Sequence, residues 1–167
     1  MKKQPRLVIL TGKPISGKST TYHNIRKLRA LNKWIFIDHH EIEREVEDKE
    51  GTKQKFFFEL WKALDTKRNI ITEDTTRDQL MMYAGKLIQE YNYKVIIFQF
   101  EVSLEEAKLR NKLREKHWKH HLVEDEELEK TYAEKEKEFD KTAILINSEK
   151  MNKKQIVEFI LKKIGEK

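Results

Sequence analysis

The chain has 167 residues, and 35 Lys or Arg against 29 Asp or Glu give a formal net charge of +6. The absence of Cys excludes a disulfide framework, a thiolate metal site and a Cys nucleophile. No apolar run approaches membrane-spanning length, and the first five residues lead directly into an apolar strand. We therefore expect no signal peptide, no membrane partner and a cytoplasmic location. The basic balance is compatible with a polyanionic partner such as nucleic acid, and equally with solvated Lys/Glu-rich helices.

Short apolar runs alternate with amphipathic segments along the chain, a pattern typical of βαβ units and a parallel sheet. The expected strands are 7–10, 34–37, 69–72, 94–100 and 143–146. The expected helices are 18–31, 41–48, 53–66, 77–91, 104–116, 125–140 and 153–164. No Pro/Gly/Ser-rich linker divides these elements. The sequence therefore predicts one three-layer α/β domain over 1–167, with a five-stranded parallel sheet flanked by helices.

The segment between the first strand and the first helix reads Gly12-Lys-Pro-Ile-Ser-Gly-Lys-Ser19, which fits the phosphate-loop pattern G-x-x-x-x-G-K-[ST]. Strand, loop and helix in that order gather backbone N–H groups and a helix N-terminus around one anion. Lys18 would reach the β- and γ-phosphates of ATP or GTP, and the Ser19 hydroxyl would ligate Mg²⁺. The alternative is a glycine-containing turn with a surface Lys. The expected nucleotide-binding residues are Gly12, Lys13, Pro14, Ile15, Ser16, Gly17, Lys18, Ser19 and Thr20.

Polar residues follow the predicted strands, and in open parallel sheets ligands bind at the carboxyl ends of strands. Asp38 directly follows Trp34–Ile37 and so projects from a strand end beside the loop. A carboxylate there can accept the proton of a hydroxyl and align its oxygen for phosphoryl transfer. Asp38 can also cap the helix that follows, and the two roles are compatible.

A second acidic pair, Glu73 and Asp74, follows the third strand. Either carboxylate could orient a Mg²⁺-bound water or hold an arginine in place. The alternative is a helix start at this position, with Thr75 or Thr76 as the capping residue.

Two arginines, Arg110 and Arg114, lie four residues apart and so share one face of a helix. They begin a segment over 110–123 that is rich in Arg, Lys and His, and that could form a lid closing over bound nucleotide. Mobile cations of this kind would neutralise charge in a phosphoryl-transfer transition state. The alternative is a solvated helix face. We interpret His117-Trp-Lys-His-His121 as a basic, aromatic lid tip rather than as a zinc site, since no acidic partner has metal-ligand spacing.

Two further clusters have a structural and a functional interpretation. His39 and His40 could position a substrate or could be ordinary residues at a strand exit. The cluster Phe56-Phe-Phe-Glu-Leu-Trp61 is expected to pack a helix onto the sheet, and its alternative role is a wall of the acceptor site.

On these residues the chain resembles the kinase domain of bacteriophage-type 5′-hydroxyl polynucleotide kinases, within the adenylate-kinase-like group of P-loop kinases. The resemblance covers most of the chain and rests on the phosphate loop, the strand exit at Ile70-Ile-Thr-Glu-Asp-Thr75 and the segment Lys108-Leu-Arg-Asn-Lys-Leu-Arg114. It implies that Asp38 is the general base and that Arg114 is the catalytic lid arginine beside Lys18. It also implies an acidic metal-site residue at Asp74 or Glu73.

The sequence departs from the family's pattern at two places. Ile15 stands where the family has Gly, and a β-branched residue fits there if the backbone φ is negative. Glu41 stands where the family has an arginine that contacts the acceptor strand, and the nearest arginine is Arg44. We therefore expect Asp38, Glu41, Arg44 and Arg77 on the acceptor side, with the acceptor site altered from the family's.

The sequence thus predicts an ATP- and Mg²⁺-dependent kinase that phosphorylates a 5′-hydroxyl end of RNA or DNA, with Asp38, Lys18 and Arg114 as catalytic residues and Arg110 at the nucleotide. The alternative is a small-molecule P-loop kinase acting on a nucleoside, a nucleotide or a nucleotide sugar. A non-catalytic nucleotide switch is disfavoured, because a switch requires neither Asp38 nor Arg114.

Overall fold

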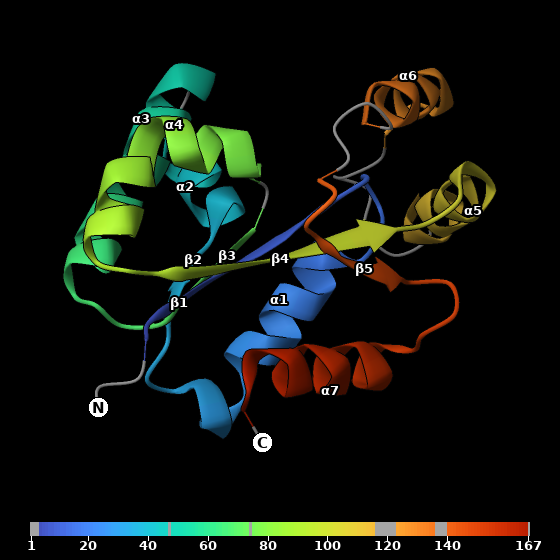
Figure 1. The fold of residues 1–167 in the computed structure, drawn as a ribbon. Coiled ribbons are helices and arrows are strands. Elements are labelled where there is room, and N and C mark those ends of the chain that lie inside the picture. Colours follow the sequence, from blue (N-terminus) through green and yellow to red (C-terminus); the bar gives the residue numbers. More distant parts are fainter. Residues whose placement is uncertain (1–3, 47, 74, 116–122, 136–139, 167) are drawn as a thin grey trace.

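The structure is a computed structural model that describes residues 4–46, 48–73, 75–115, 123–135 and 140–166. Five strands form one sheet in the order β2-β3-β1-β4-β5, and every neighbouring pair runs parallel (Figure 1). Helices cover both faces of this sheet. The predicted α/β architecture with a parallel five-stranded sheet is therefore confirmed.

The predicted strands are all present, with ends that differ from the predicted ones by at most two residues. The strands are β1 (Arg6–Gly12), β2 (Ile35–Ile37), β3 (Ile70–Glu73), β4 (Lys94–Glu101) and β5 (Ile144–Asn147). The α-helices are α1 (Lys18–Arg26), α2 (His39–Glu45), α3 (Lys49–Asp65), α4 (Arg77–Glu90), α5 (Leu104–Glu115), α6 (Asp125–Lys135) and α7 (Lys153–Ile164).

The central strand β1 supplies both faces of the core, because successive side chains of a strand point to opposite sides. Leu7 and Ile9 pack against α2, α3 and α4, whereas Val8 and Leu10 pack against α1 and α7. All four side chains are fully buried. Burial on both faces explains why this strand is a continuous apolar run rather than an alternating one.

Helices α5 and α6 stand apart from these two layers, beyond the carboxyl end of β4 (Figure 1). A third, smaller apolar cluster joins them to the phosphate loop through Ile15, Val102, Ala107, Leu128 and Tyr132. The lid predicted over 110–123 lies largely outside the described residues, which include its first part at the end of α5. Helices α5 and α6 lie at the end of the sheet where ligands bind in folds of this type.

Two predicted helices end earlier than expected, and each early end has a local cause. The first helix ends at Arg26, because Leu28 is extended and a 3₁₀ turn over Arg29–Leu31 follows. The second helix ends at Glu45 rather than at residue 48, because Asp48 caps the next helix by accepting a hydrogen bond from Gly51 N. Polar caps thus leave fewer residues between α2 and α3 along the chain than hydrophobic periodicity predicts.

The described ranges contain no helix that combines the length and the apolar character needed to cross a membrane. The longest of them, α3, is 17 residues and carries charged side chains along its length.

Gly12 lies where β1 passes closest to β4, and its φ of +133° is one that residues with a side chain rarely adopt. A Cβ at this position would lie 2.2 Å from the carbonyl oxygen of Phe100 and 2.7 Å from its nitrogen. Both atoms belong to the backbone of a central strand, so neither can move without disturbing the sheet.

We predict that Gly12→Ala lowers the free energy of unfolding by about 3 kcal/mol or more, since overpacking and backbone strain add. Gly17→Ala is the matched control, because Gly17 also has a positive φ, +93°, but nothing lies within 4 Å of its Cβ position. The control should lose only about 1 kcal/mol, from backbone strain alone. Urea denaturation of both variants measures the difference, and equal losses would contradict the steric explanation.

Candidate functional site

The phosphate loop connects β1 to α1 and encloses a cavity of about 280 Å³. Gly17, in the left-handed conformation, is the N-cap of α1, so the first backbone N–H groups of the helix face the loop. The cavity is lined by loop residues from Gly12 to Thr20, by Arg114 from α5, by His40 from α2 and by Val123 and Thr131. Backbone donors, a helix N-terminus and basic side chains thus converge on a space suited to an anion.

Ile15 has a φ of +59°, so the condition under which a β-branched residue fits this position without strain is not met. A left-handed conformation costs a β-branched residue about 1–2 kcal/mol. The Ile15 side chain is buried against the cluster that contains Ala107, Leu128 and Tyr132. Burying an Ile side chain contributes about 1.5–3 kcal/mol, which offsets the strain. The departure from Gly therefore ties the phosphate loop to the lid helices.

Tyr132 of α6 makes a second connection between lid and loop, because its hydroxyl donates to the carbonyl of Pro14 at 3.0 Å. Burial raises the pKa of Tyr132 well above its ordinary value, so the hydroxyl stays protonated and remains a donor. The ammonium of Lys13 lies 5.1 Å from the centre of the Tyr132 ring and 3.6 Å from Glu101 Oε2. These contacts fix the outer edge of the loop.

Lys18 and Ser19 both line the phosphate cavity. Lys18 is buried, and its ammonium donates to the carbonyls of Gly12 and Lys13, at 3.1 Å each. The ammonium is therefore held over the interior of the loop, where it would contact the phosphates of a bound nucleotide.

Arg110 and Arg114 extend from α5 toward the loop and line a larger cavity of about 700 Å³ beside the phosphate cavity. Arg110 is fixed by Ser148, whose hydroxyl and carbonyl accept at 3.0 and 2.8 Å, and by Glu106 at 2.7 Å. Arg114 lines both cavities. Burial and then the nearby Arg110 guanidinium lower the pKa of Arg114 from its usual value. Burial and a neighbouring positive charge both disfavour the charged form of Arg114, so an anion bound in the loop would stabilise that form.

The larger cavity continues to the start of α7, where Asn152 caps the helix and Lys153 and Lys154 follow. Its volume and its mixed apolar and polar lining suit a nucleoside next to the phosphates. Arg110, predicted to contact the nucleotide, lines this larger cavity.

Asp38 is placed by the end of β2 and caps α2, accepting a hydrogen bond from Glu41 N through Oδ1 at 3.1 Å. Its side chain is fully buried, and Oδ2 has no hydrogen-bond partner among the described residues. The nearest cation is Arg26 of α1, whose Nη1 lies 3.8 Å from Asp38 Oδ2 and 2.8 Å from Glu41 Oε1. Capping therefore uses one carboxylate oxygen, and the other remains available for a ligand or a proton.

Asp38 does not line the phosphate cavity but a neighbouring one of about 520 Å³, which runs along the edge strand β2 between α2 and α3. Glu41 lines this edge cavity as well. His40 connects the two regions, since it belongs to the same helix and lines the phosphate cavity. Asp38 and His40 thus belong to one short segment that lines both cavities, although the Asp38 carboxylate itself does not line the phosphate cavity.

Three buried polar atoms in this region lack a hydrogen-bond partner within the described ranges: Ser16 Oγ, Tyr22 Oη and Asp38 Oδ2. Burial, and after it the nearby carboxylate of Asp38, raise the pKa of Tyr22, with a smaller effect from Glu73. Most buried polar atoms in proteins are hydrogen-bonded, so a group of such atoms indicates a place built for a ligand.

Glu73 ends β3, is fully buried and pairs in register with Leu10 of β1, directly before the loop. The Ser19 hydroxyl and a carboxylate at Glu73 are oxygen ligands, the type that Mg²⁺ prefers, and nucleotide phosphates would complete the set. The residues present therefore fit a magnesium ion. Asp74, the alternative candidate, lies outside the described residues, as do His117, His120 and His121 of the predicted lid tip.

The remaining acceptor-side candidates lie apart from Asp38. Arg44 is exposed and donates to the carbonyl of His40 within its own helix, at 3.2 Å. Arg77 starts α4 and donates to the Thr142 hydroxyl at 2.5 Å, so it points to the segment before β5. The N-cap of α4 is Thr76, which forms a capping box with Gln79.

The aromatic cluster of α3 divides between core and surface. Phe56, Phe57 and Leu60 pack onto the sheet, as predicted, whereas Phe58 and Trp61 are exposed. Trp61 donates through Nε1 to the carbonyl of Tyr83 and so joins α3 to α4.

Sequence reasoning missed Arg26, Ser148, Asn111 and Tyr132 as site residues. Arg26 lies at the end of α1, where a basic residue usually complements the helix dipole, and nothing local indicates its contact with Asp38. Asn111 lies between the two predicted arginines and donates to the carbonyl of Val123 at 2.6 Å, joining the ends of the lid. A single Asn between two arginines of a charged helix is a sequence signal that could have indicated a side chain with a structural hydrogen bond.

Comparison with protein-family models and with curated proteins gave no match. Solved structures do match. A proposed kinase from Chloroflexus aurantiacus superposes with a TM-score of 0.70 at 13% identity, covering 99% of this chain and 98% of that one. Shikimate kinase from Acinetobacter baumannii gives 0.59 at 19% identity, covering 96% and 93%. A chain of the Pnkp1/Rnl/Hen1 RNA repair complex gives 0.62 at 20% identity, covering 84% of this chain and 48% of that one.

These chains share the fold of the present one, an α/β fold with a parallel five-stranded sheet, and several of them are kinases by name. Small-molecule kinases and a component of an RNA repair complex are similar to this chain to a comparable degree. Because the identities are low, the likeness establishes the fold, and the substrate must be argued from the site.

We predict that Arg26 is coupled more strongly to the buried Asp38 than to the exposed Glu41, although Glu41 is 1 Å nearer (2.8 against 3.8 Å). Water and salt screen the exposed pair, so its coupling energy should be below about 0.5 kcal/mol, against about 1 kcal/mol for Asp38. Double-mutant cycles with Arg26→Gln, Asp38→Asn and Glu41→Gln in urea denaturation measure both values. A larger coupling to Glu41 would contradict this assignment.

Proposed function

We propose that this chain is an ATP- and Mg²⁺-dependent kinase that transfers the γ-phosphate to a 5′-hydroxyl end of RNA or DNA. The observation that carries the kinase assignment is the phosphate cavity, which Lys18 of the loop and Arg114 of the lid both line. Asp38, two residues before His40 of that cavity's lining, has one buried carboxylate oxygen outside any hydrogen bond to the described residues. A nucleotide-binding switch has no use for that carboxylate.

In the proposed reaction the loop amides and Lys18 hold the β- and γ-phosphates, and Arg114 neutralises charge that develops on the transferring group. The acceptor hydroxyl oxygen bonds to the γ-phosphorus while the bond to the β-phosphate oxygen breaks. The hydroxyl proton passes to Asp38 Oδ2, and ADP leaves with the electron pair of the broken bond. Bound Mg²⁺ supplies charge neutralisation at the phosphate oxygens, and Ser19 with Glu73 would hold it.

The lid contacts support closure over the nucleotide. Ile15 and Tyr132 connect α5 and α6 to the phosphate loop itself, and Arg110 is fixed at the entrance to the nucleoside-sized cavity. Exclusion of water from the transferring phosphoryl group requires such a cover.

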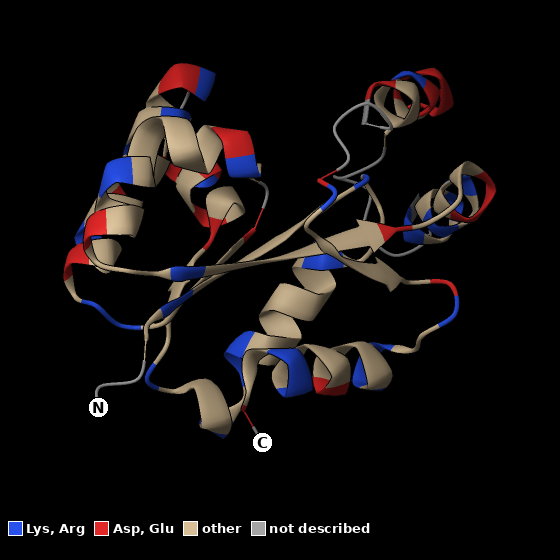
Figure 2. Ribbon diagram, viewed as in Figure 1, with Lys and Arg blue, Asp and Glu red and all other residues tan. Residues whose placement is uncertain are grey.

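A polynucleotide acceptor is supported by the net charge of +6 and by the resemblance of the loop and lid motifs to 5′-hydroxyl polynucleotide kinases. Figure 2 shows Lys and Arg spread over helices on both faces of the sheet. Arg26 adds a cation beside Asp38, where the terminal nucleotide of an acceptor strand would lie.

One observation favours a small hydroxyl-bearing molecule without a phosphodiester backbone as the alternative acceptor. The helix that follows Asp38 carries Glu41, Glu43 and Glu45, and two of these carboxylates line the edge cavity with Asp38. Carboxylates repel a phosphodiester strand but accept hydrogen bonds from hydroxyl groups. A gluconokinase and shikimate kinase share the fold over at least 93% of their chains, at 13% and 19% identity.

We predict that Asp38→Asn reduces turnover by about 10²- to 10⁴-fold, because the general base is lost. Asn is as good an N-cap as Asp, so α2 should remain folded and the dissociation constant for ATP should change little. Asp48→Asn is the matched control, since Asp48 caps α3 in the same way at an exposed position. Initial rates and ATP titrations test this, and near-normal turnover of Asp38→Asn would exclude it as the base.

We predict that ATP labelled at the γ-phosphate transfers its label to 5′-hydroxyl oligonucleotides in preference to nucleosides, nucleotides, gluconate or shikimate. The rate at limiting oligonucleotide should fall steeply as salt rises, because phosphate contacts release counterions. Lys18→Ala provides the background for contaminating kinases. Label found only on small molecules would favour the alternative acceptor and overturn the polynucleotide assignment.

A further inference from the structure

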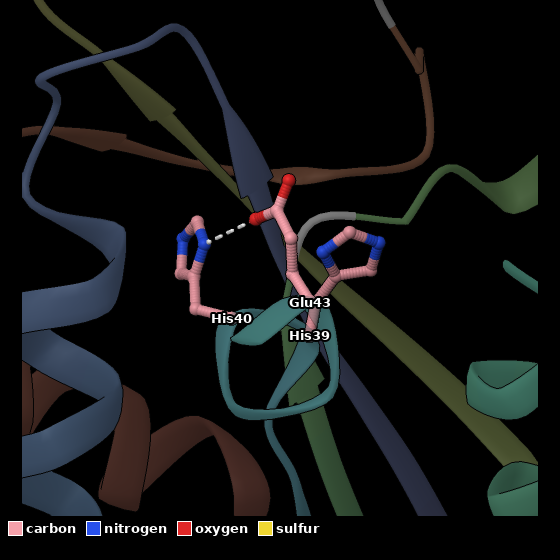
Figure 3. A group of neighbouring side chains, drawn as sticks. All are labelled: His39, His40 and Glu43. Carbon is pink, nitrogen blue, oxygen red and sulfur yellow. Dashed lines mark hydrogen bonds and ion pairs between the residues drawn. The ribbon is translucent and has the colours of Figure 1, made fainter. Parts of the chain in front are cut away.

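We propose that His39, His40 and Glu43 form a binding site for a divalent transition-metal ion, with zinc as the preferred ion. The site is separate from the Mg²⁺ position at Ser19, and the inference does not depend on the kinase activity. In Figure 3 the Glu43 carboxylate lies between the two imidazole rings, all three extending from the first turns of α2. Among the described residues, these three side chains form the group whose spacing would allow them to hold a metal ion together.

The spacing of the three groups is close to that of a zinc site. One ligand atom from each residue lies within 4.8 Å of the others, and His40 Nδ1 is 3.4 Å from Glu43 Oε2. Two ligand atoms of a tetrahedral zinc ion are about 3.3 Å apart, because each bond is about 2.0–2.1 Å long. One edge of the tetrahedron is thus already formed, and rotation of side chains at the surface would close the other two.

The ligand types favour zinc over magnesium. Two imidazole nitrogens with one carboxylate suit zinc and its transition-metal neighbours, whereas Mg²⁺ prefers oxygen ligands. Three protein ligands leave a fourth position for water or an anion.

The surroundings of the site would stabilise a cation. Asp38 caps α2 and Glu41 lies in its first turn, so carboxylates offset the positive end of this short helix. Packing of the His39 ring on Phe56, with ring centres 5.7 Å apart, restricts that ligand before metal binds. His40 lines the phosphate cavity, so a bound ion would add positive charge to the wall that α2 contributes.

Titration of the whole chain with ZnCl₂, followed by calorimetry without nucleotide or acceptor, tests the proposal directly. We expect His40→Ala and His39→Ala each to weaken zinc binding at least tenfold, since loss of even an outer-shell partner costs about 10- to 100-fold. His40→Ala is the primary variant, because His40 is more exposed than a core residue and its loss should leave the fold intact. Thermal unfolding without metal verifies this.

Two control variants separate this site from the other histidines. His23→Ala changes an exposed histidine of α1 and should bind zinc as the wild type does. The triple variant His117→Ala/His120→Ala/His121→Ala should retain the site. Co²⁺ in place of zinc should give an intense visible absorption typical of four-coordinate cobalt, and this absorption should be lost in Glu43→Ala. Absence of zinc binding, or loss of binding in the triple variant alone, would overturn the proposal.

Discussion

The close approach of Gly12 to the backbone of Phe100 fixes where the phosphate loop leaves the sheet. Only a residue without a side chain permits β1 and β4 to remain paired up to this point. The loop therefore leaves the sheet at a fixed position. This position is directly beside the end of β3, and β3 lies between it and the end of β2. The distance between the candidate anion site and Asp38 is a consequence of strand order rather than of loop conformation.

The lid is held to this fixed point by packing as well as by polar contacts. Ile15 belongs to the loop in sequence and to the apolar cluster of α5 and α6 in space. Tyr132 and Asn111 add hydrogen bonds between segments that are remote or separated along the chain. In the proposed reaction, a change in the position of α5 and α6 would therefore also act on the loop through Ile15.

Much of the fold could be predicted, because it depends on features that are local in sequence. Continuous apolar runs identify strands buried on two faces, and the Gly12–Ser19 pattern identifies a loop whose backbone geometry requires those residues. The ends of helices were less predictable, since Asp48 could continue one helix or cap the next. The positive φ of Ile15 was not predictable, because a packing gain from distant helices outweighs the local preference.

The candidate site shows the same division. Lys18 and Arg114, which the sequence predicts at the nucleotide, both line the phosphate cavity, whereas Asp38 lines a different cavity along β2. The sequence gives no indication of Arg26, because its role depends on how α1 lies against the start of α2. Contacts of this type join side chains from different elements, and no periodicity or motif records them.

The carboxylate of Asp38 has two inequivalent oxygens, and this asymmetry has a consequence for turnover. Oδ1 is committed to the backbone of α2, whereas Oδ2 faces Arg26. In the proposed reaction, the proton taken up from the acceptor would reside on Oδ2 while the helix keeps its acceptor at Oδ1. Repeated protonation cycles would then leave the first turn of α2 wound, and its histidines would keep their orientation from one catalytic round to the next.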